Sequence, residues 1–247
     1  MDESVNKMNK FDVLGNMNLR TKTLLAIGLS AFILILVVVI SFFIDPKSIT
    51  TNWTMMNQPP SLEHIFGTDW LGRDMFIRTL KGLGLSVQIG FFASILSSII
   101  AVALAFLSSF NKHLDSFVSW LIDVFLSIPH ILLIILISIA LGGGAFGVLI
   151  GVAFTHWTSL ARVLRAEIKR IKTSEFVTIS EQLGQSKFWI ARKQILPLVI
   201  TQVIVGTILI FPHAIMHEAS AIAIAVFGTP YFSPSSESFA FNSGKSG

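Results

Sequence analysis

The chain has no cysteine and few charged residues, and both absences limit what it can be. Without cysteine, its 247 residues can form neither a disulfide framework nor a thiolate metal site. Only 13% of the residues are charged, against about a quarter in a typical soluble domain. In contrast, 53% are hydrophobic and the mean hydropathy is +0.74. These values indicate an all-α polytopic membrane protein rather than a soluble domain.

The apolar residues gather into five runs, each of roughly the length that a helix needs to cross a bilayer, which is about 20 residues. They predict spans at 24–44, 87–107, 117–141, 146–163 and 197–215. A cleaved signal peptide is the alternative for the first run. That run is longer than the roughly 7–15 apolar residues of a signal core, so we expect an uncleaved span.

Positive charge is concentrated in two places. Eight of the 18 Lys and Arg residues lie between Arg162 and Lys193, and four more precede the first apolar run. Because Lys- and Arg-rich loops stay in the cytoplasm, we expect a cytoplasmic tail over 1–23 and an extracytoplasmic segment over 45–82. The clustering indicates a membrane face and not nucleic-acid binding. At the other end, 229–247 is an atypical Ser/Gly-rich tail with no run long enough to span.

A polar, basic insert over 165–197 separates the fourth and fifth apolar runs. Phe176, Ile179 and Leu183 recur at helical spacing and predict a short amphipathic helix, which can lie in a groove on a partner. Gly184 interrupts the helical pattern, and Leu196-Pro197 closes the insert. The alternative is an ordinary solvated basic loop.

A second motif precedes the second apolar run. It comprises Gly67, Thr68, Asp69, Gly72, Arg73, Asp74 and Arg78. The two glycines allow tight turns. The spacing predicts ion pairs of Asp69 with Arg73 and of Asp74 with Arg78. The alternative to a ligand site is a network that simply holds an outer loop together, since surface ion pairs contribute little by themselves.

Histidines suggest a metal path. The candidate residues are His156, His213, His217 and Glu218. Imidazole suits Ni²⁺. An i, i+4 histidine pair beside a glutamate also resembles zinc hydrolases, but here the glutamate follows the second histidine. Histidines bonded to nearby backbone are the third interpretation.

The chain has no complete nucleotide-binding loop. Gly244-Lys245-Ser246 matches only the end of one, and Phe239 stands where the first glycine is required. We therefore expect that the chain binds no nucleotide or other cofactor.

Both motifs resemble those of permease subunits of bacterial ABC importers, in the dipeptide, oligopeptide and nickel branch. The outer motif matches His-x-x-Gly-Thr-Asp-x-x-Gly-Arg-Asp-x-x-x-Arg from His64 to Arg78. The insert matches the cytoplasmic coupling loop at Gly184, Leu196 and Pro197 and departs from it at Thr178, Ile179, Ser180 and Gln194. Two shorter matches are Asp123 with Ser127 and Pro129, and Glu218-Ala219-Ser220.

The resemblance implies a path for nickel ions or di- and oligopeptides, enclosed with a second homologous permease. It also implies two ATP-binding subunits, which would hydrolyse the ATP, and an extracytoplasmic solute-binding protein. The permease domain is expected over 24–228 in the inner membrane. The family has six spans, so the sequence is expected to lack the last one. The alternatives are a secondary transporter or channel, and an intramembrane metal-dependent hydrolase.

Overall fold

The computed structural model describes residues 18–227, and most of these are helical. Its helices are α2 (Leu19–Phe43), α3 (Met75–Ser108), α4 (Lys112–Ser127), α5 (His130–Ala140), α6 (Gly144–Lys172), α7 (Glu175–Gln182), α8 (Lys187–Ile190) and α9 (Leu196–Phe227). Two 3-10 turns, η1 (Pro46–Ile49) and η2 (Trp53–Met55), follow α2, and a π-helical turn, η3 (Ala191–Ile195), joins α8 to α9. The all-α prediction is confirmed.

Four helical stretches are long and apolar enough to cross a membrane, and the bent pair α4–α5 makes a fifth when counted as one span. The prediction of five spans is met when this pair is counted as one span. Two compact units divide the described chain, one up to Val87 and one from Gln88 on. The predicted tail over 229–247 and most of that over 1–23 lie outside the described residues.

The first unit contains α2, the segment that follows it and the start of α3. None of the apolar 18-residue window of α2 is buried, as expected of a helix that lipid surrounds. The second helix, α3, begins at Met75, well before the predicted span at 87–107. It starts there because Asp74 Oδ1 accepts hydrogen bonds from the N–H groups of Phe76 and Ile77 and so caps the helix.

The predicted continuous span at 117–141 is wrong. The structure has two helices there, α4 and α5, bent by 94°. Ile128 is extended (φ −101°, ψ 134°), because proline at 129 disfavours helical backbone in the residue before it and supplies no N–H. Neither helix, of 16 and 11 residues, has the length of about 20 residues that crosses a bilayer alone.

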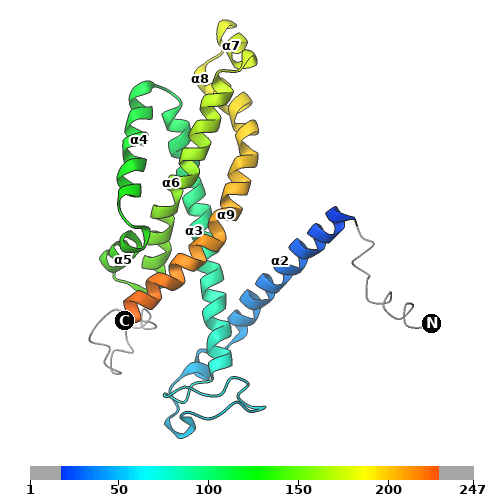
Figure 1. Ribbon diagram of the computed structural model, residues 1–247, viewed down its shortest axis with the longest axis vertical. Helices are drawn as coiled ribbons and strands as arrows, with labels where there is room; N and C mark the ends of the chain where they lie inside the picture. The colour runs from blue at the N-terminus through cyan, green and yellow to red at the C-terminus, as the bar shows by residue number, and fades with distance from the viewer. Residues whose placement is uncertain (1–17, 228–247) are drawn as a thin grey trace, which may run out of the picture. The chain divides into compact units, whose positions relative to one another are not determined.

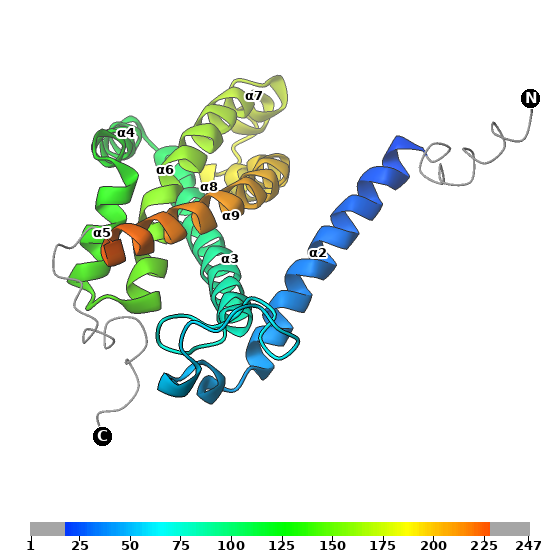
Figure 2. The ribbon, with the colours of Figure 1, turned by 60° about the horizontal axis from the view of Figure 1, so that its bottom comes forward.

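In the second unit, α6 is the central helix (Figures 1 and 2). It contacts α4, α5 and α9, and its buried side chains include Trp157, Ala161 and Leu164. Two glycines one turn apart, Gly147 and Gly151, admit the backbone of α5. A Cβ at these positions would stand 2.8 Å from Ser138 O and 2.9 Å from Ile134 O. Small residues spaced in this way are typical of close helix packing in membranes.

The fifth span does not begin at Pro197, as the sequence had suggested. Helical structure runs from Lys187 through η3 into α9, so that residues 187–222 form one candidate span. The π-helical turn immediately precedes Pro197, where the proline ring would crowd the carbonyl of Lys193 in regular α-helix. The predicted insert over 165–197 therefore includes the last turns of α6, which extends to Lys172, and also contains α7, α8 and η3.

Candidate functional site

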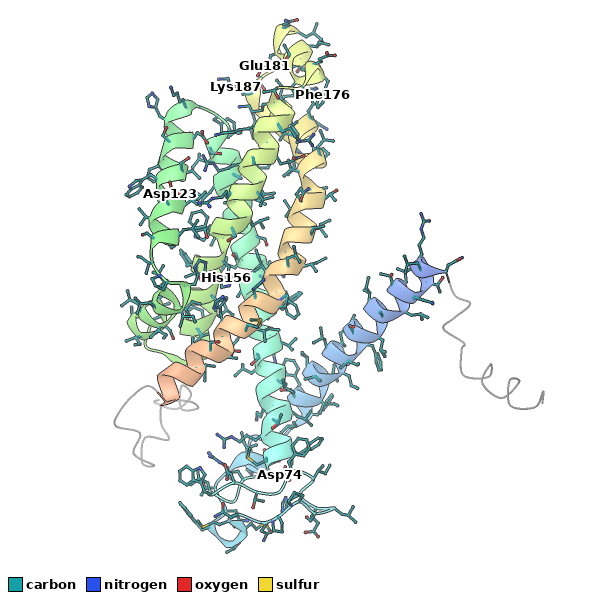
Figure 3. All side chains as sticks on the ribbon, in the orientation of Figure 1. Asp74, Asp123, His156, Phe176, Glu181 and Lys187 are labelled. Carbon is teal, nitrogen blue, oxygen red and sulfur yellow. The ribbon has the colours of Figure 1, made fainter. Side chains whose placement is uncertain are left out.

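One end of the second unit is formed by α7 and α8, at the top of Figures 1 and 3. The helix α7 packs against the core through Val177 and Ser180, which are 0% and 8% exposed. Beside these residues lie the predicted apolar residues Phe176, Ile179 and, at the cap, Leu183, which are 45%, 54% and 75% exposed. Three large apolar side chains are thus exposed on a short helix that is itself anchored. Such a surface fits a partner's groove.

Gly184 ends α7 in the left-handed conformation that its sequence position suggests, with φ +80°. Gln185 N–H donates to Ser180 O (3.1 Å) and Gly184 N–H donates to Glu181 O (3.0 Å). This pair of bonds is the Schellman motif, which satisfies the last carbonyls of a helix and favours glycine at the turn. Gly184 therefore fixes the angle at which the exposed apolar face of α7 is presented.

Two positions that depart from the family pattern meet in the structure. Gln194 Nε2 donates to Ser180 Oγ at 2.5 Å, which joins α7 to η3. In the sequence both residues are only mismatches to the family pattern, and no spacing rule predicts a bond between them. The only signal was that both departures are polar. The hydrogen bond helps to hold α7 on the core.

The outer motif is a network centred on two aspartates. Asp69 Oδ2 accepts from Arg73 Nε (2.9 Å), as predicted, and also from Arg78 Nη1 (2.7 Å). The predicted pairing of Asp74 with Arg78 is wrong. Asp74 Oδ2 pairs instead with His64 Nδ1 at 2.7 Å, while its other oxygen caps α3 (Figure 3 marks Asp74 at the start of that helix). Asp74 is thus occupied by His64 and the helix end, and Arg78, whose side chain is 47% exposed, binds the buried carboxylate of Asp69.

Both aspartates have lowered pKa values. Burial alone would raise the pKa of Asp69, but bonds from the N–H and guanidinium of Arg73 and from the N–H of Leu71 lower it below its ordinary 3.8. Burial likewise opposes the shift at Asp74, where His64 and the N–H groups of α3 lower the pKa. Both carboxylates therefore hold the segment together in the charged form.

The glycines of the outer motif are required by two close contacts. Gly67 (φ +70°) and Gly72 (φ +71°) would place a Cβ 2.4 Å from Gln58 O and 1.8 Å from Asn52 O. Between them, Thr68 Oγ1 accepts from Gln58 N (2.8 Å) and donates to Met55 O. The motif is consequently a folded turn structure whose polar groups bind one another. Of the two interpretations of this motif, a network that holds the outer loop together fits these contacts better than a ligand site does.

The histidines form a different group from the one predicted. The rings of His130, His156 and His217, from α5, α6 and α9, have centroids 5.0–6.1 Å apart. His213 is exposed and lies outside this group. His130, which directly follows Pro129, was not among the predicted residues. Figure 3 shows His156 inside the second unit, where its Nδ1 lies 3.0 Å from Val152 O.

No three His, Asp or Glu side chains in residues 18–227 are arranged to hold a metal ion. The nickel path and the hydrolase therefore gain no metal centre from the described part of the chain. Glu218 is 2% exposed within α9. Asp123, the acidic residue of the third apolar run, pairs with Arg162 at 3.3 Å, as expected for an acid near a basic neighbour.

The known proteins that this chain resembles belong to one family. Residues 93–242 match the model of the binding-protein-dependent transport system inner membrane component. The chain is 34% identical over 188 residues to the dipeptide transport system permease protein DppC of Bacillus subtilis, covering 75% of this chain and 59% of that protein. It is 33% identical over 203 residues to the oligopeptide transport system permease protein OppC of the same organism (81% and 67%). An OppC of Haemophilus influenzae is 30% identical over 192 residues (76% and 62%).

This chain thus spans about three fifths to two thirds of the length of these relatives. The matched region contains α4 to α9, including the exposed face of α7 and the turn at Gly184. The relatives are named as permease proteins, not as enzymes. Together with its apolar helices, these matches show that the chain belongs to the family of binding-protein-dependent transport system inner membrane components, multi-pass proteins of the cell membrane.

Proposed function

We propose that this chain is a permease subunit of an ATP-driven importer for di- or oligopeptides. It would enclose the path with a second homologous permease and receive substrate from an extracytoplasmic binding protein. Two separate subunits would bind and hydrolyse ATP. The names of the relatives support the peptide substrate, and family membership favours this reading over a secondary transporter, a channel or a hydrolase.

The observation that carries the proposal is the exposed apolar face of α7, formed by Phe176, Ile179 and Leu183. These side chains lie on a helix that is capped by Gly184 and bonded to Gln194. A partner that displaces this face would therefore move α6 and α9 with it, because α7 is not a flexible loop. ATP would shift the permease between two states only through such contacts, because a ligand shifts an equilibrium by its different affinity for each state.

The test uses the natural absence of cysteine, which makes every introduced thiol unique. Ile179→Cys lies on the exposed face of α7, whereas Thr178→Cys is also exposed but points away from it. In the assembled complex, Ile179→Cys should be protected from a thiol reagent and should cross-link to the ATPase subunit. Thr178→Cys should react freely. Equal labelling of both positions in the complex would refute the assignment of α7.

Uptake supplies the functional measurement. Phe176→Glu places a charge where an apolar contact is proposed, and it should abolish ATP-dependent peptide uptake while the chain remains in the membrane. The control is Gln182→Glu, which adds a charge to α7 outside the apolar face and should leave uptake within twofold. Full uptake with Phe176→Glu would contradict coupling through this face.

Nickel is the second candidate substrate, and the grouping of His130, His156 and His217 is the observation that favours it. If these imidazoles contact nickel during passage, His217→Ala should lower nickel uptake far more than peptide uptake. Equal loss of both would assign the histidine a structural role. Unchanged nickel uptake would remove it from the path.

A further inference from the structure

A cluster of cations lines an open hollow at the α7 end of the second unit. The hollow lies where the end of α3, the start of α4 and the last turns of α6 meet. Its charged side chains are Lys112, Asp115, Arg165, Lys169 and Lys172. Four positive groups thus surround one negative group, and the proposed coupling through α7 uses none of them.

The arrangement inside the hollow is fixed by hydrogen bonds. Arg165 Nη2 binds Asp115 Oδ1 (2.5 Å) and Ser119 Oγ (2.5 Å), and Lys169 Nζ binds Asp115 Oδ2 (2.9 Å). Lys172 Nζ donates to Ser109 O in the turn after α3. Asp115 therefore offsets only part of the charge.

Two of the cations are also accessible. Lys112 is exposed and makes no ion pair within residues 18–227, and the Lys169 side chain is 62% exposed. Both ammonium groups can therefore turn toward an anion without breaking the Arg165–Asp115 contact. A phosphate group matches this chemistry, because it accepts several charge-assisted hydrogen bonds at once.

The position of the hollow relative to the membrane surface indicates whether it binds a lipid phosphate or a soluble one. Phe117 and Trp120 stack on an exposed face of α4, with ring centroids 6.0 Å apart. Exposed tryptophan is typical of the boundary between lipid chains and headgroups. At 1.5 Å per residue, these rings lie about 8–12 Å along α4 from Lys112. The hollow therefore lies beyond these rings, on the headgroup side of that boundary.

We propose that the hollow binds the headgroup of an anionic phospholipid. A lipid is favoured over a soluble phosphate because lipid headgroups are concentrated at this depth, and basic pockets between membrane helices attract them. The bound lipid would bridge α3, α4 and α6 beside the segment that leads into α7. This site is independent of the transported substrate and of the coupling proposal.

The test is lipid binding by the full chain, purified in a neutral detergent and titrated with phosphatidylglycerol or phosphatidylcholine. Bound lipid is counted by native mass spectrometry. Phosphatidylglycerol should bind at least tenfold more tightly than phosphatidylcholine. Each Lys near an anionic surface is worth about fivefold in affinity. The double variant Lys112→Gln/Lys169→Gln should therefore weaken phosphatidylglycerol binding by at least tenfold.

The matched control is Arg192→Gln/Lys193→Gln, which removes two exposed cations elsewhere in the basic segment. It should bind phosphatidylglycerol as the unmodified chain does. Equal loss in both double variants would mean general attraction to positive charge, and no loss in the first would exclude the hollow; either result overturns the proposal. Glycerol 3-phosphate serves as the soluble competitor. If it displaces the lipid at equal concentration, the hollow is a site for free phosphate and not for a lipid.

Discussion

At the residue scale, the glycines are of two kinds. Some are required because the backbone has a positive φ or a close contact there, whereas others could be replaced by alanine. Gly67→Ala and Gly72→Ala combine a positive φ with a Cβ 2.4 Å or 1.8 Å from a carbonyl oxygen. We expect each to disrupt the outer segment and to make residues 45–74 sensitive to limited proteolysis. The control is Gly82→Ala in α3, where nothing lies within 4 Å and alanine favours the helix by about 1 kcal/mol. Protease resistance in all three variants would show that the outer turns tolerate a Cβ.

Gly184 has a positive φ that favours glycine, but there is open space around its Cα for a side chain. No atom lies within 4 Å of an added Cβ, so substitution costs only the strain of φ +80°. Gly184→Asn should be tolerated, because asparagine visits this conformation, whereas Gly184→Val should destabilise the α7 end by roughly 1–2 kcal/mol. Gly184→Asp should abolish uptake with the protein still in the membrane if it perturbs the proposed contact surface. Hydrogen exchange of α7 in the three variants, measured beside uptake, separates strain from loss of the contact.

The aspartates of the outer motif predict how the first unit responds to acid. The folded-state pKa values of Asp69 and Asp74 are lowered, so their stabilising contribution is complete above the ordinary value of 3.8. It is lost as the pH falls through the lower folded-state values, since the unfolded chain then binds more protons. Protease resistance of residues 45–74 should therefore be constant from pH 8 to pH 5 and should fall below about pH 3.8. Asp69→Asn should weaken that resistance at neutral pH as well and reduce its loss in acid.

At the scale of elements, the packing of α5 on α6 depends on two glycines that face backbone and not flexible side chains. Gly151→Ala would bring a Cβ to 2.9 Å from Ile134 O, so the helices must separate. We expect a loss of about 1–3 kcal/mol in stability, the usual cost of overpacking. Gly28→Ala in α2 has no atom within 4 Å and should be neutral or slightly stabilising. Thermal unfolding in detergent compares the two, and equal stability would contradict the close α5–α6 contact.

Proline has two different effects on neighbouring helices. Pro129 separates α4 from α5 and leaves Ile128 extended, whereas Pro197 is accommodated in a continuous helix that begins before it. The π-helical turn η3 supplies the room that Pro197 requires, and no comparable turn lies before Pro129. A proline in the sequence does not reveal which of these two effects it has, so the break at Pro129 and the helix that precedes Pro197 were both missed.

At the scale of the whole molecule, sidedness in the membrane is the main prediction. The clusters of positive charge place 162–196 inside and 45–82 outside. Because the chain contains no cysteine, Ser48→Cys and Thr173→Cys each introduce a single thiol. An impermeant reagent added to intact cells should label Ser48→Cys and should reach Thr173→Cys only after the membrane is opened. Labelling of both from outside would reverse the orientation of the α7 end.

The sequence by itself determined the features that depend on neighbouring residues. Run length and hydropathy predicted helices of spanning length, because each backbone group in lipid must be satisfied within its own helix. The turn at Gly184 and the spacing of Phe176, Ile179 and Leu183 are likewise local, and the structure contains both.

Tertiary structure decided which side chains meet across elements. Spacing along one helix predicted an ion pair of Asp74 with Arg78. Folding of the outer segment instead pairs Asp74 with His64, and Arg78 with Asp69. His130 joins His156 and His217 only because three helices converge. The Gln194–Ser180 bond and the cationic hollow arise in the same way, from groups between 14 and 63 residues apart. Such contacts depend on the path of the backbone between them, which local pattern does not specify.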